Sequence, residues 1–218
     1  MTLNNNIKEA RSGKADSLVI FLHGYGADGK DLLGLADPLA QQLSNTMFMS
    51  PDAPNSCKMN PMGFEWFPIP RMDGSTQEQA NAGRDGAAVI LNGFLDEVAK
   101  ETGIPASRTF LLGFSQGCMM SLHVAPRRTE ALAGVIGMSG KLLEPEKLAQ
   151  EAIQKPPVLL VHGDQDDVVP FAELEQAANA LSAADFDVYA LVSKGTAHGI
   201  ANDGLGAALQ FIQQNLKA

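Results

Sequence analysis

The stretch Gly113-Phe114-Ser115-Gln116-Gly117 determines how the rest of this chain is interpreted. It follows a short run rich in apolar residues, from Arg108 to Leu112, and leads into the helical pattern of residues 118–122. The predicted order is therefore a strand, a G-x-S-x-G turn and a helix. A serine on so sharp a turn needs glycine two positions before and two positions after it, because side chains there would collide where the strand and the helix cross.

This arrangement, in which a turn lifts a serine hydroxyl above the end of a strand, is called a nucleophile elbow. The first N–H groups of the helix point to the place where negative charge would develop if Ser115 attacked a carbonyl carbon. A glycine-rich turn that carries an incidental serine is the alternative interpretation. The loops elsewhere in the chain favour the elbow.

The composition is that of an ordinary globular domain with a substantial core: 218 residues, 45% hydrophobic and 19% charged. The net charge of −9 argues against nucleic acid and against an anionic membrane surface as partners, because both favour basic patches. Residues 1–6 show no secretory signal, and no apolar run approaches transmembrane length. Cys57 and Cys118 are too few for a disulfide framework. We therefore expect a cytoplasmic protein.

Short apolar runs alternate with helical patterns throughout the sequence. Strands are predicted at residues 17–22, 47–50, 108–112, 132–138, 157–161 and 187–192. Helical patterns are found at residues 32–43, 87–103, 118–125, 145–151 and 171–181, and from residue 202 onward. This alternation predicts an α/β fold with a mostly parallel central sheet and helices on both faces. We see no linker or repeat and expect one domain over residues 1–218.

Residues 51–76 do not follow this alternation, since they contain five prolines and no convincing period. A loop of this length in a compact domain is usually functional or disordered. The sequence Phe64-Glu-Trp66-Phe67 argues against disorder, because disordered segments are poor in aromatic residues. We interpret the segment as an ordered loop that covers a site, with aromatic side chains filling a gap in the core as the alternative.

A nucleophilic serine needs a base, and histidine is the usual one. His23 and His162 each precede a glycine at a strand end, where a histidine can brace loops. His123 lies two turns beyond Ser115 on the following helix and is expected to have a structural or surface role. His198, in the loop after the last strand, is the only histidine that leaves room for a strand-end acid between it and Ser115, in the order serine, acid, histidine.

The acid should come from a loop after a strand, where it can hold the imidazole tautomer. Asp164, Asp166 and Asp167 all meet this condition, and spacing alone does not choose among them. Asp185 and Asp187 stand at the start of a strand, at the opposite edge of the sheet. A calcium site in this acidic loop is disfavoured, because the glycine-centred spacing of an EF-hand is missing.

Two preset N–H groups are expected to hold an oxyanion. One is the amide after the serine, that of Gln116. The other should come from the glycine-rich loop after the first strand, between Gly24 and Gly26.

With these features in place, the chain resembles the carboxylesterase/acyl-protein thioesterase family, also called the phospholipase/carboxylesterase family of α/β-hydrolases. The resemblance covers nearly all residues and is specific, because G-F-S-Q-G together with H-G-x-x-D-x-x-V-P is far rarer than G-x-S-x-G alone. The motifs that carry it are Phe21-Leu-His-Gly-Tyr-Gly-Ala-Asp28, Pro51-Asp-Ala-Pro54, Trp66-Phe67, Gly113 to Gly117, His162-Gly-Asp-Gln-Asp-Asp-Val-Val-Pro170 and Ala197-His-Gly199.

The resemblance implies an α/β-hydrolase fold without a large cap domain, with Ser115 as nucleophile, His198 as base and Asp166 as the acid. It places the second oxyanion donor at the backbone amide of Tyr25, beside that of Gln116. Many members have leucine where this chain has Tyr25, which affects the shape of the pocket but not the backbone donor.

Family members resemble small, lidless esterases, often dimeric, that need no cofactor or metal. They act on short- to medium-chain acyl esters, and some cleave lysophospholipids or protein thioesters. We expect the acyl chain to meet an apolar wall made by residues of the 51–76 segment: Trp66, Phe64, Phe67 and Met62.

Thioester hydrolysis, on proteins or coenzyme A esters, is the alternative within the same chemistry, because the catalytic residues would be identical. A dienelactone hydrolase would favour cysteine where Ser115 stands, and a peptidase of this fold usually carries larger additional elements. A catalytically idle fold that serves as a receptor or scaffold is disfavoured, because every member of the constellation has a candidate here.

Overall fold

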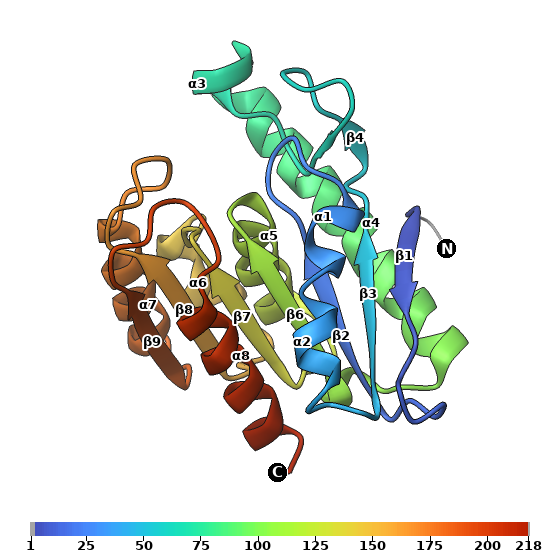
Figure 1. Cartoon of the computed structure of the whole chain (residues 1–218). Coiled ribbons are helices and arrows are strands. Elements are labelled where there is room, and N and C mark those ends of the chain that lie inside the picture. The colour runs from blue at the N-terminus through green and yellow to red at the C-terminus, as the bar shows by residue number, and fades with distance from the viewer. Residues whose placement is uncertain (1–2, 218) are drawn as a thin grey trace.

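A computed structural model describes residues 3–217 and contains a seven-stranded sheet in the order β1-β3-β2-β6-β7-β8-β9 (Figure 1). Strand β1 is antiparallel to β3, and all the other neighbouring strands are parallel. The predicted mostly parallel sheet is confirmed. The strands are β1 Asn5–Lys8, β2 Ser17–Leu22, β3 Thr46–Pro51, β6 Thr109–Phe114, β7 Gly134–Met138, β8 Val158–Gly163 and β9 Val188–Ser193.

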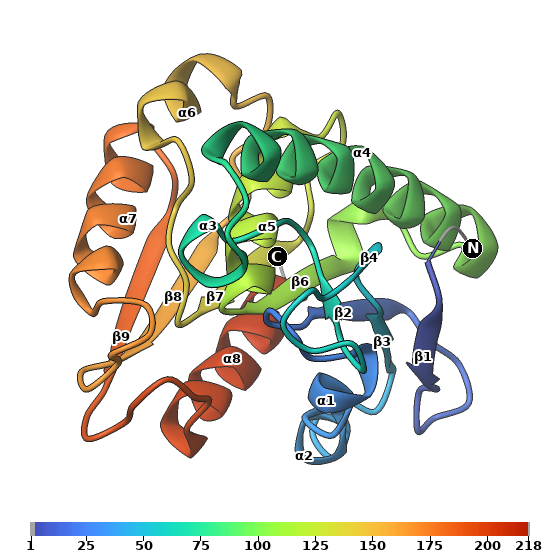
Figure 2. The same ribbon diagram turned by 90° about the horizontal axis from the view of Figure 1, so that it is seen from above.

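Two layers of helices cover the sheet (Figure 2). One face carries α4 Gln77–Thr102, α5 Gln116–Val124, α6 Pro145–Glu151 and α7 Ala172–Ala183. The other face carries α1 Gly29–Leu33, α2 Ala36–Ala40 and α8 Asn202–Asn215. Short 3-10 turns occupy Ala106–Arg108 and Ala125–Arg127.

The central strand β2 shows why the sheet needs both layers. Leu18, Ile20 and Leu22 enter the apolar cluster beneath α4 and α5, whereas Val19 and Phe21 enter the cluster beneath α2 and α8. All five side chains are fully buried. A strand buried on both faces has no polar side to show, which explains its uninterrupted apolar sequence.

Two elements differ from the sequence-based expectation. Strand β1 has no apolar run, because it is a partly exposed edge strand that pairs only with β3. The single helix expected over residues 32–43 is two short helices, separated at Gly34 and Leu35. Glycine weakens a helix interior and Pro38 offers no N–H to continue an incoming helix, so the segment breaks there.

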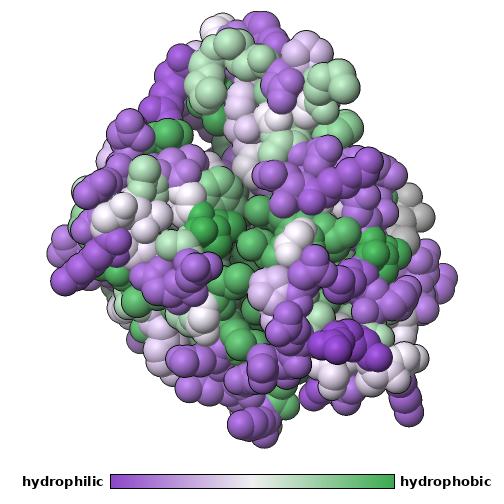
Figure 3. All heavy atoms as spheres, viewed as in Figure 1, coloured by the Kyte–Doolittle hydropathy of each residue, from purple (hydrophilic) through white to green (hydrophobic). Residues whose placement is uncertain are grey.

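The segment 51–76 is ordered and projects beyond the carboxyl ends of the strands (Figure 1). It contains a small hairpin, in which β4 Asn55–Ser56 pairs with β5 Phe64–Glu65, and the short helix α3 Pro70–Asp73. In the space-filling view the surface is hollowed beneath this projection (Figure 3). The segment therefore stands above the sheet edge at which the loops after the parallel strands meet.

Candidate active site

The turn between β6 and α5 has the geometry that the sequence demands. Ser115 adopts φ 53° and ψ −113°, outside the backbone regions that residues other than glycine prefer. A Cβ atom on Gly113 would lie 2.2 Å from the carbonyl oxygen of Gly117, and one on Gly117 would lie 1.8 Å from that of Leu22. Neither space admits a side chain, so glycine is required at both positions.

Three side chains from three separate loops meet above this turn. His198 Nε2 lies 3.0 Å from Ser115 Oγ, and His198 Nδ1 lies 2.8 Å from Asp166 Oδ2. The imidazole packs against the Phe114 ring, with 4.9 Å between the ring centroids. A carboxylate on Nδ1 selects the tautomer in which Nδ1 carries the proton, so that Nε2 is free to accept the proton of the serine hydroxyl.

The carboxylate of Asp166 is itself fixed by its loop. Its Oδ1 atom accepts hydrogen bonds from the backbone N–H groups of Val168 and Val169, at 3.0 and 2.9 Å. Burial alone would raise the pKa of Asp166, but the bonds from His198 and these two amides outweigh it and hold the pKa below its ordinary value. The group is therefore ionised at neutral pH and oriented toward the histidine.

The structure separates the three aspartates that spacing left equivalent. Asp164 accepts a hydrogen bond from the backbone N–H of Gly195 at 2.7 Å, and Asp167 is exposed at the tip of the loop. Of the three, only Asp166 reaches His198.

Tyr25 and Gln116, whose backbone amides are expected to hold an oxyanion, line the same cleft as Ser115. A Cβ atom on Gly24 would lie 3.4 Å from that of Ser115, so the glycine-rich loop passes directly beside the serine. Across residues 3–217, neither amide donates a hydrogen bond to a protein acceptor. Both N–H groups are thus available to a bound oxygen atom.

Comparison with known proteins identifies the group to which this chain is related. The sequence model of the phospholipase/carboxylesterase family matches residues 4–216. The chain belongs to this family. As a member, it is a serine hydrolase with the α/β-hydrolase fold.

Similar proteins carry related names. Esterase PE8, known from a crystal structure, is 42% identical in sequence to this chain. The two structures superimpose over 97% of this chain and 98% of the PE8 chain, with a TM-score of 0.92. Acyl-protein thioesterase 1 of Neurospora crassa is 30% identical over 91% of this chain and 86% of its own length. Acyl-protein thioesterase 1 of Yarrowia lipolytica is 29% identical over 91% of this chain and 92% of its own length.

Tyr25, in the glycine-rich loop, reaches toward the projecting segment. The Tyr25 hydroxyl donates a hydrogen bond of 3.4 Å to Asp73 Oδ2, and burial raises the pKa of this phenol. The same Asp73 carboxylate accepts bonds from the backbone N–H groups of Ile69 and Ser75, on both sides of α3. Tyr25 therefore ties the glycine-rich loop to the 51–76 segment.

Two further histidines brace loops, as the sequence suggested. His23 Nδ1 donates to the carbonyl oxygen of Gly24 at 2.7 Å, and its Nε2 accepts from the backbone N–H of Ala53 at 2.9 Å. Burial lowers the pKa of His23, which keeps this pattern of a neutral ring in place. His162 Nε2 lies 3.0 Å from the carbonyl oxygen of Val169 and 3.2 Å from Asp166 Oδ2.

His123 has a different environment. It is buried on α5, and among the described residues its Nδ1 atom has no hydrogen-bond partner. Burial, followed by the positive charges of Arg127 and Arg84, lowers its pKa from 6.5 to about 4. The ring is therefore neutral in the folded protein down to mildly acidic pH.

We expect wild-type protein to lose stability relative to His123→Gln as the pH falls from about 6.5 toward about 4. In this window the unfolded chain binds a proton at His123 and the folded chain does not, so the free energy of unfolding drops by about 2 kcal/mol between pH 7 and pH 5. Urea unfolding of both proteins at the two pH values measures the difference. Equal losses in the two proteins would contradict it.

The four residues predicted to form an acyl wall lie in different environments. Trp66 has 0% of its surface exposed, and its indole N–H donates to the carbonyl oxygen of His23 at 3.0 Å. The prediction that Trp66 contacts substrate is therefore wrong, and the alternative of an aromatic filling the core applies. Met62 is 86% exposed at the hairpin tip, Phe64 is half-buried against the core, and Phe67 lines a cavity.

Gln116 connects this segment to the elbow. Its side-chain Oε1 accepts a hydrogen bond from the backbone N–H of Trp66 at 2.8 Å, and its Nε2 donates to the carbonyl oxygen of Phe67 at 2.7 Å. The carboxamide is almost completely buried. The residue after the serine thus holds the base of the projecting segment with both of its polar atoms.

Several cavities lie near the carboxyl ends of the strands, and two of them, here called the cleft and the side cavity, adjoin each other at the elbow. The cleft, of about 200 Å³, contains Ser115, His198 and the loop from Gly24. The side cavity, of about 320 Å³, is lined largely by apolar side chains that include Phe67, Leu143 and Pro170.

Beyond Phe67, sequence reasoning missed the apolar side chains that line these cavities, and Met119 was the one that a sequence pattern could have identified. Met119 follows Ser115 by one helical turn, and helical spacing could have placed it beneath the site.

Among the residues that the structure describes, no three His, Cys, Asp or Glu side chains are placed to hold a metal ion. Within residues 3–217, no helix is long and apolar enough to cross a membrane.

Proposed function

We propose that this chain is a serine carboxylesterase that hydrolyses short- to medium-chain acyl esters through an acyl-enzyme intermediate. The observation that carries the proposal is the hydrogen-bonded line from Ser115 Oγ through His198 to Asp166, which stands beside two available amides. These are the parts that acyl transfer needs: a nucleophile, a base with an oriented tautomer, and donors for an oxyanion.

In the first half of the reaction, Ser115 Oγ attacks the ester carbonyl carbon while His198 Nε2 takes the hydroxyl proton. The carbonyl oxygen becomes an oxyanion, which the N–H groups of Tyr25 and Gln116 stabilise, each by roughly 3 kcal/mol in the transition state. The ionised Asp166 stabilises the imidazolium that forms. His198 then gives its proton to the departing alcohol, which leaves Ser115 acylated.

In the second half, water takes the place of the alcohol. His198 accepts a proton from the water as it attacks the acyl carbon, and the same two amides hold the second oxyanion. Collapse of this intermediate breaks the bond to Ser115 Oγ, which recovers its proton from His198, and the carboxylic acid leaves.

The size of the cleft supports short to medium acyl chains as substrates. Its volume of about 200 Å³ accommodates a small acyl group at Ser115, and its remaining wall includes Ile69, Met119 and Val169. These side chains take the role that the sequence assigned to Trp66. Because these three side chains are apolar, they favour alkyl chains over charged acyl groups.

Initial rates on p-nitrophenyl acetate, butyrate and octanoate test the proposal, with wild type beside Ser115→Ala. We expect wild-type hydrolysis that is fastest on the short or medium esters and at least about 10⁴-fold slower in the variant, because the nucleophile is lost. A wild-type rate no higher than that of Ser115→Ala on all three esters would refute the carboxylesterase.

Thioester hydrolysis is the second candidate, favoured by the names of the curated relatives, the acyl-protein thioesterases 1 of Neurospora crassa and Yarrowia lipolytica. The same triad would act, with a thiolate as leaving group. Rates on oxygen and sulfur esters of the same acyl group separate the two. Release of fatty acid from a lysophospholipid, which is an oxygen ester, tests the further alternative of a lysophospholipase. The single domain, the cytoplasmic location and the dimer stay predictions, the last of which light scattering can measure.

A further inference from the structure

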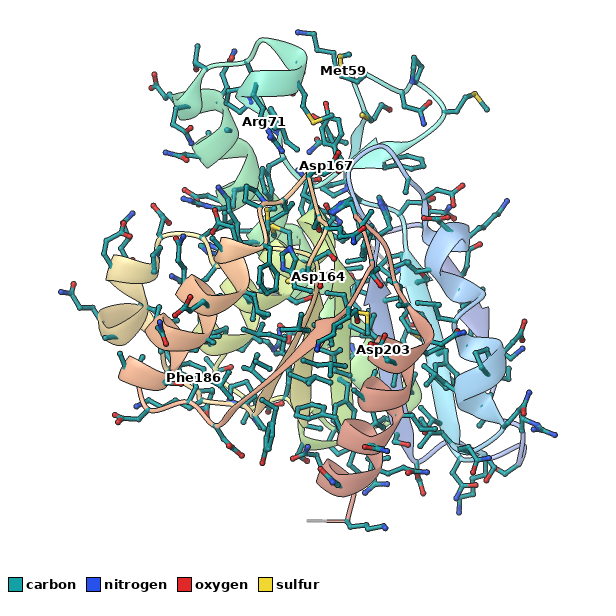
Figure 4. The ribbon with its side chains drawn as sticks, turned by 60° about the vertical axis from the view of Figure 1, so that its left-hand side comes forward. Met59, Arg71, Asp164, Asp167, Phe186 and Asp203 are labelled. Carbon is teal, nitrogen blue, oxygen red and sulfur yellow. The ribbon has the colours of Figure 1, made fainter. Side chains whose placement is uncertain are left out.

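One hydrogen bond joins the projecting segment to the loop that carries the acid. Arg71, on α3, donates from Nη2 to the carbonyl oxygen of Val168 at 2.8 Å, and the two residues are 97 positions apart in the sequence. Both are exposed at the surface, Val168 by 41%. In Figure 4 the labelled Arg71 and Asp167 approach the same region from these two elements.

This bond lies where the two cavities adjoin. The cleft and the side cavity share five lining residues: Ile69, Arg71, Met119, Val168 and Val169. Met119 and Val169 are buried, whereas Arg71 and Val168 are exposed. The boundary between the cavities therefore has an apolar floor and an outer cover made by the Arg71–Val168 bond.

Arg71 is suited to a contact that opens and closes. Among the described residues, no carboxylate lies within ion-pair distance of its guanidinium group, and the only protein acceptor it binds is the backbone oxygen of Val168. A single hydrogen bond contributes only a modest net free energy, because water takes the place of the lost partner when the bond breaks. The guanidinium can therefore exchange this partner for water during turnover.

We propose that the Arg71–Val168 bond is a strap that sets acyl-chain length, an inference that rests on the proposed esterase. A short acyl group on Ser115 fits in the cleft while the strap is closed. A longer chain must continue over Met119 into the side cavity, toward Leu143 and Pro170, and it can pass only when the strap opens. Arg71 is thus a specificity-determining residue that disfavours long acyl chains, and the side cavity is the site that receives them.

The test compares Arg71→Met and Arg71→Lys with wild type on p-nitrophenyl acetate, butyrate and octanoate. Methionine keeps an apolar stem and removes the donor, so kcat/KM on octanoate relative to acetate should rise about tenfold, the value of one modest hydrogen bond. The rate on acetate should change less than about twofold. Lysine can still donate to the Val168 oxygen and should restore most of the wild-type ratio. Arg11→Met, on an exposed arginine far from the cleft, should leave all three rates unchanged.

Three outcomes would overturn the strap. The octanoate-to-acetate ratio of Arg71→Met could equal that of wild type, or all three rates could fall by one common factor, as expected if Arg71 merely supports α3. Arg71→Lys could also behave as Arg71→Met does, which would assign the effect to shape rather than to the bond. Thermal unfolding of each variant identifies any loss of folded protein.

If the proposed esterase function is wrong, wild type will hydrolyse these esters no faster than Ser115→Ala, which distinguishes that result from a failure of the strap alone. In that event the same variants are measured on acetyl and octanoyl thioesters, and the same ratio decides. If wild type hydrolyses neither the oxygen esters nor the thioesters, both the proposed function and the strap are refuted.

Discussion

Asp166→Asn should lower kcat by about 10⁴-fold while the protein stays folded. The two carboxylate oxygens have separate partners: Oδ1 accepts from the Val168 and Val169 amides, and Oδ2 accepts from His198 Nδ1. An asparagine oxygen can keep the first pair of bonds, which leaves its NH₂ group facing His198. Nδ1 must then accept, Nε2 carries the proton, and the ring no longer receives the proton of Ser115.

The measurement is kcat on p-nitrophenyl butyrate, with thermal unfolding to confirm that the variant is folded. Asp167→Asn is the matched control, since it removes a carboxylate from the exposed tip of the same loop, and it should change kcat less than about twofold. A large loss in Asp167→Asn, or near-wild-type activity in Asp166→Asn, would show that the geometry does not identify the acid.

Gly117→Ala should destabilise the fold by more than about 3 kcal/mol, enough to abolish soluble protein. The new methyl group would lie 1.8 Å from the carbonyl oxygen of Leu22, which belongs to the central strand β2 and cannot retreat without breaking its pairing with β6. Overpacking against backbone costs more than overpacking against a flexible side chain, because no rotamer change relieves it.

Urea unfolding, or the soluble yield where no folded protein is recovered, measures this effect. The matched control is Gly86→Ala, on the exposed side of α4, where an added Cβ would meet no atom within 4 Å. Alanine favours the helix there and should raise the free energy of unfolding by about 0.5–1 kcal/mol. A folded Gly117→Ala as stable as wild type would contradict the steric account of the elbow.

Local constraints explain why so much of the fold could be predicted. A strand buried on both faces must be apolar throughout, as β2 is, and the elbow admits only glycine at two fixed positions. These requirements act within a few residues and therefore leave a pattern in the sequence. The pairing of Ser115 with His198 was also accessible, because chain order in this fold left a single histidine in the right place.

What escaped prediction depends on partners far away in the chain. Strand β1 is defined by its pairing with β3 and has no apolar period of its own. Trp66 resembled a substrate contact until its burial against His23 was visible, because a buried aromatic and a cleft aromatic look alike in sequence. The bond of Arg71 to a backbone oxygen leaves no pattern in the sequence, because every residue has a carbonyl group that could accept it.

The attachment of the projecting segment to Gln116 has a consequence for attempts to engineer substrate range. Because the Gln116 carboxamide holds the backbone of both Trp66 and Phe67, a substitution that shifts the backbone at these two positions would also shift Gln116, whose amide is expected to hold the oxyanion. Among the described residues, the exposed side chains of Met59 and Met62 at the hairpin tip and the lining side chain of Leu143 make no hydrogen bond to the elbow, whereas Asn60 between the two methionines donates to the carbonyl oxygen of Gly26. Directed evolution of the acyl preference has its freest positions at the two methionines and Leu143, and recombination between homologues would best exchange the whole block from Trp66 to Gln116 as one unit.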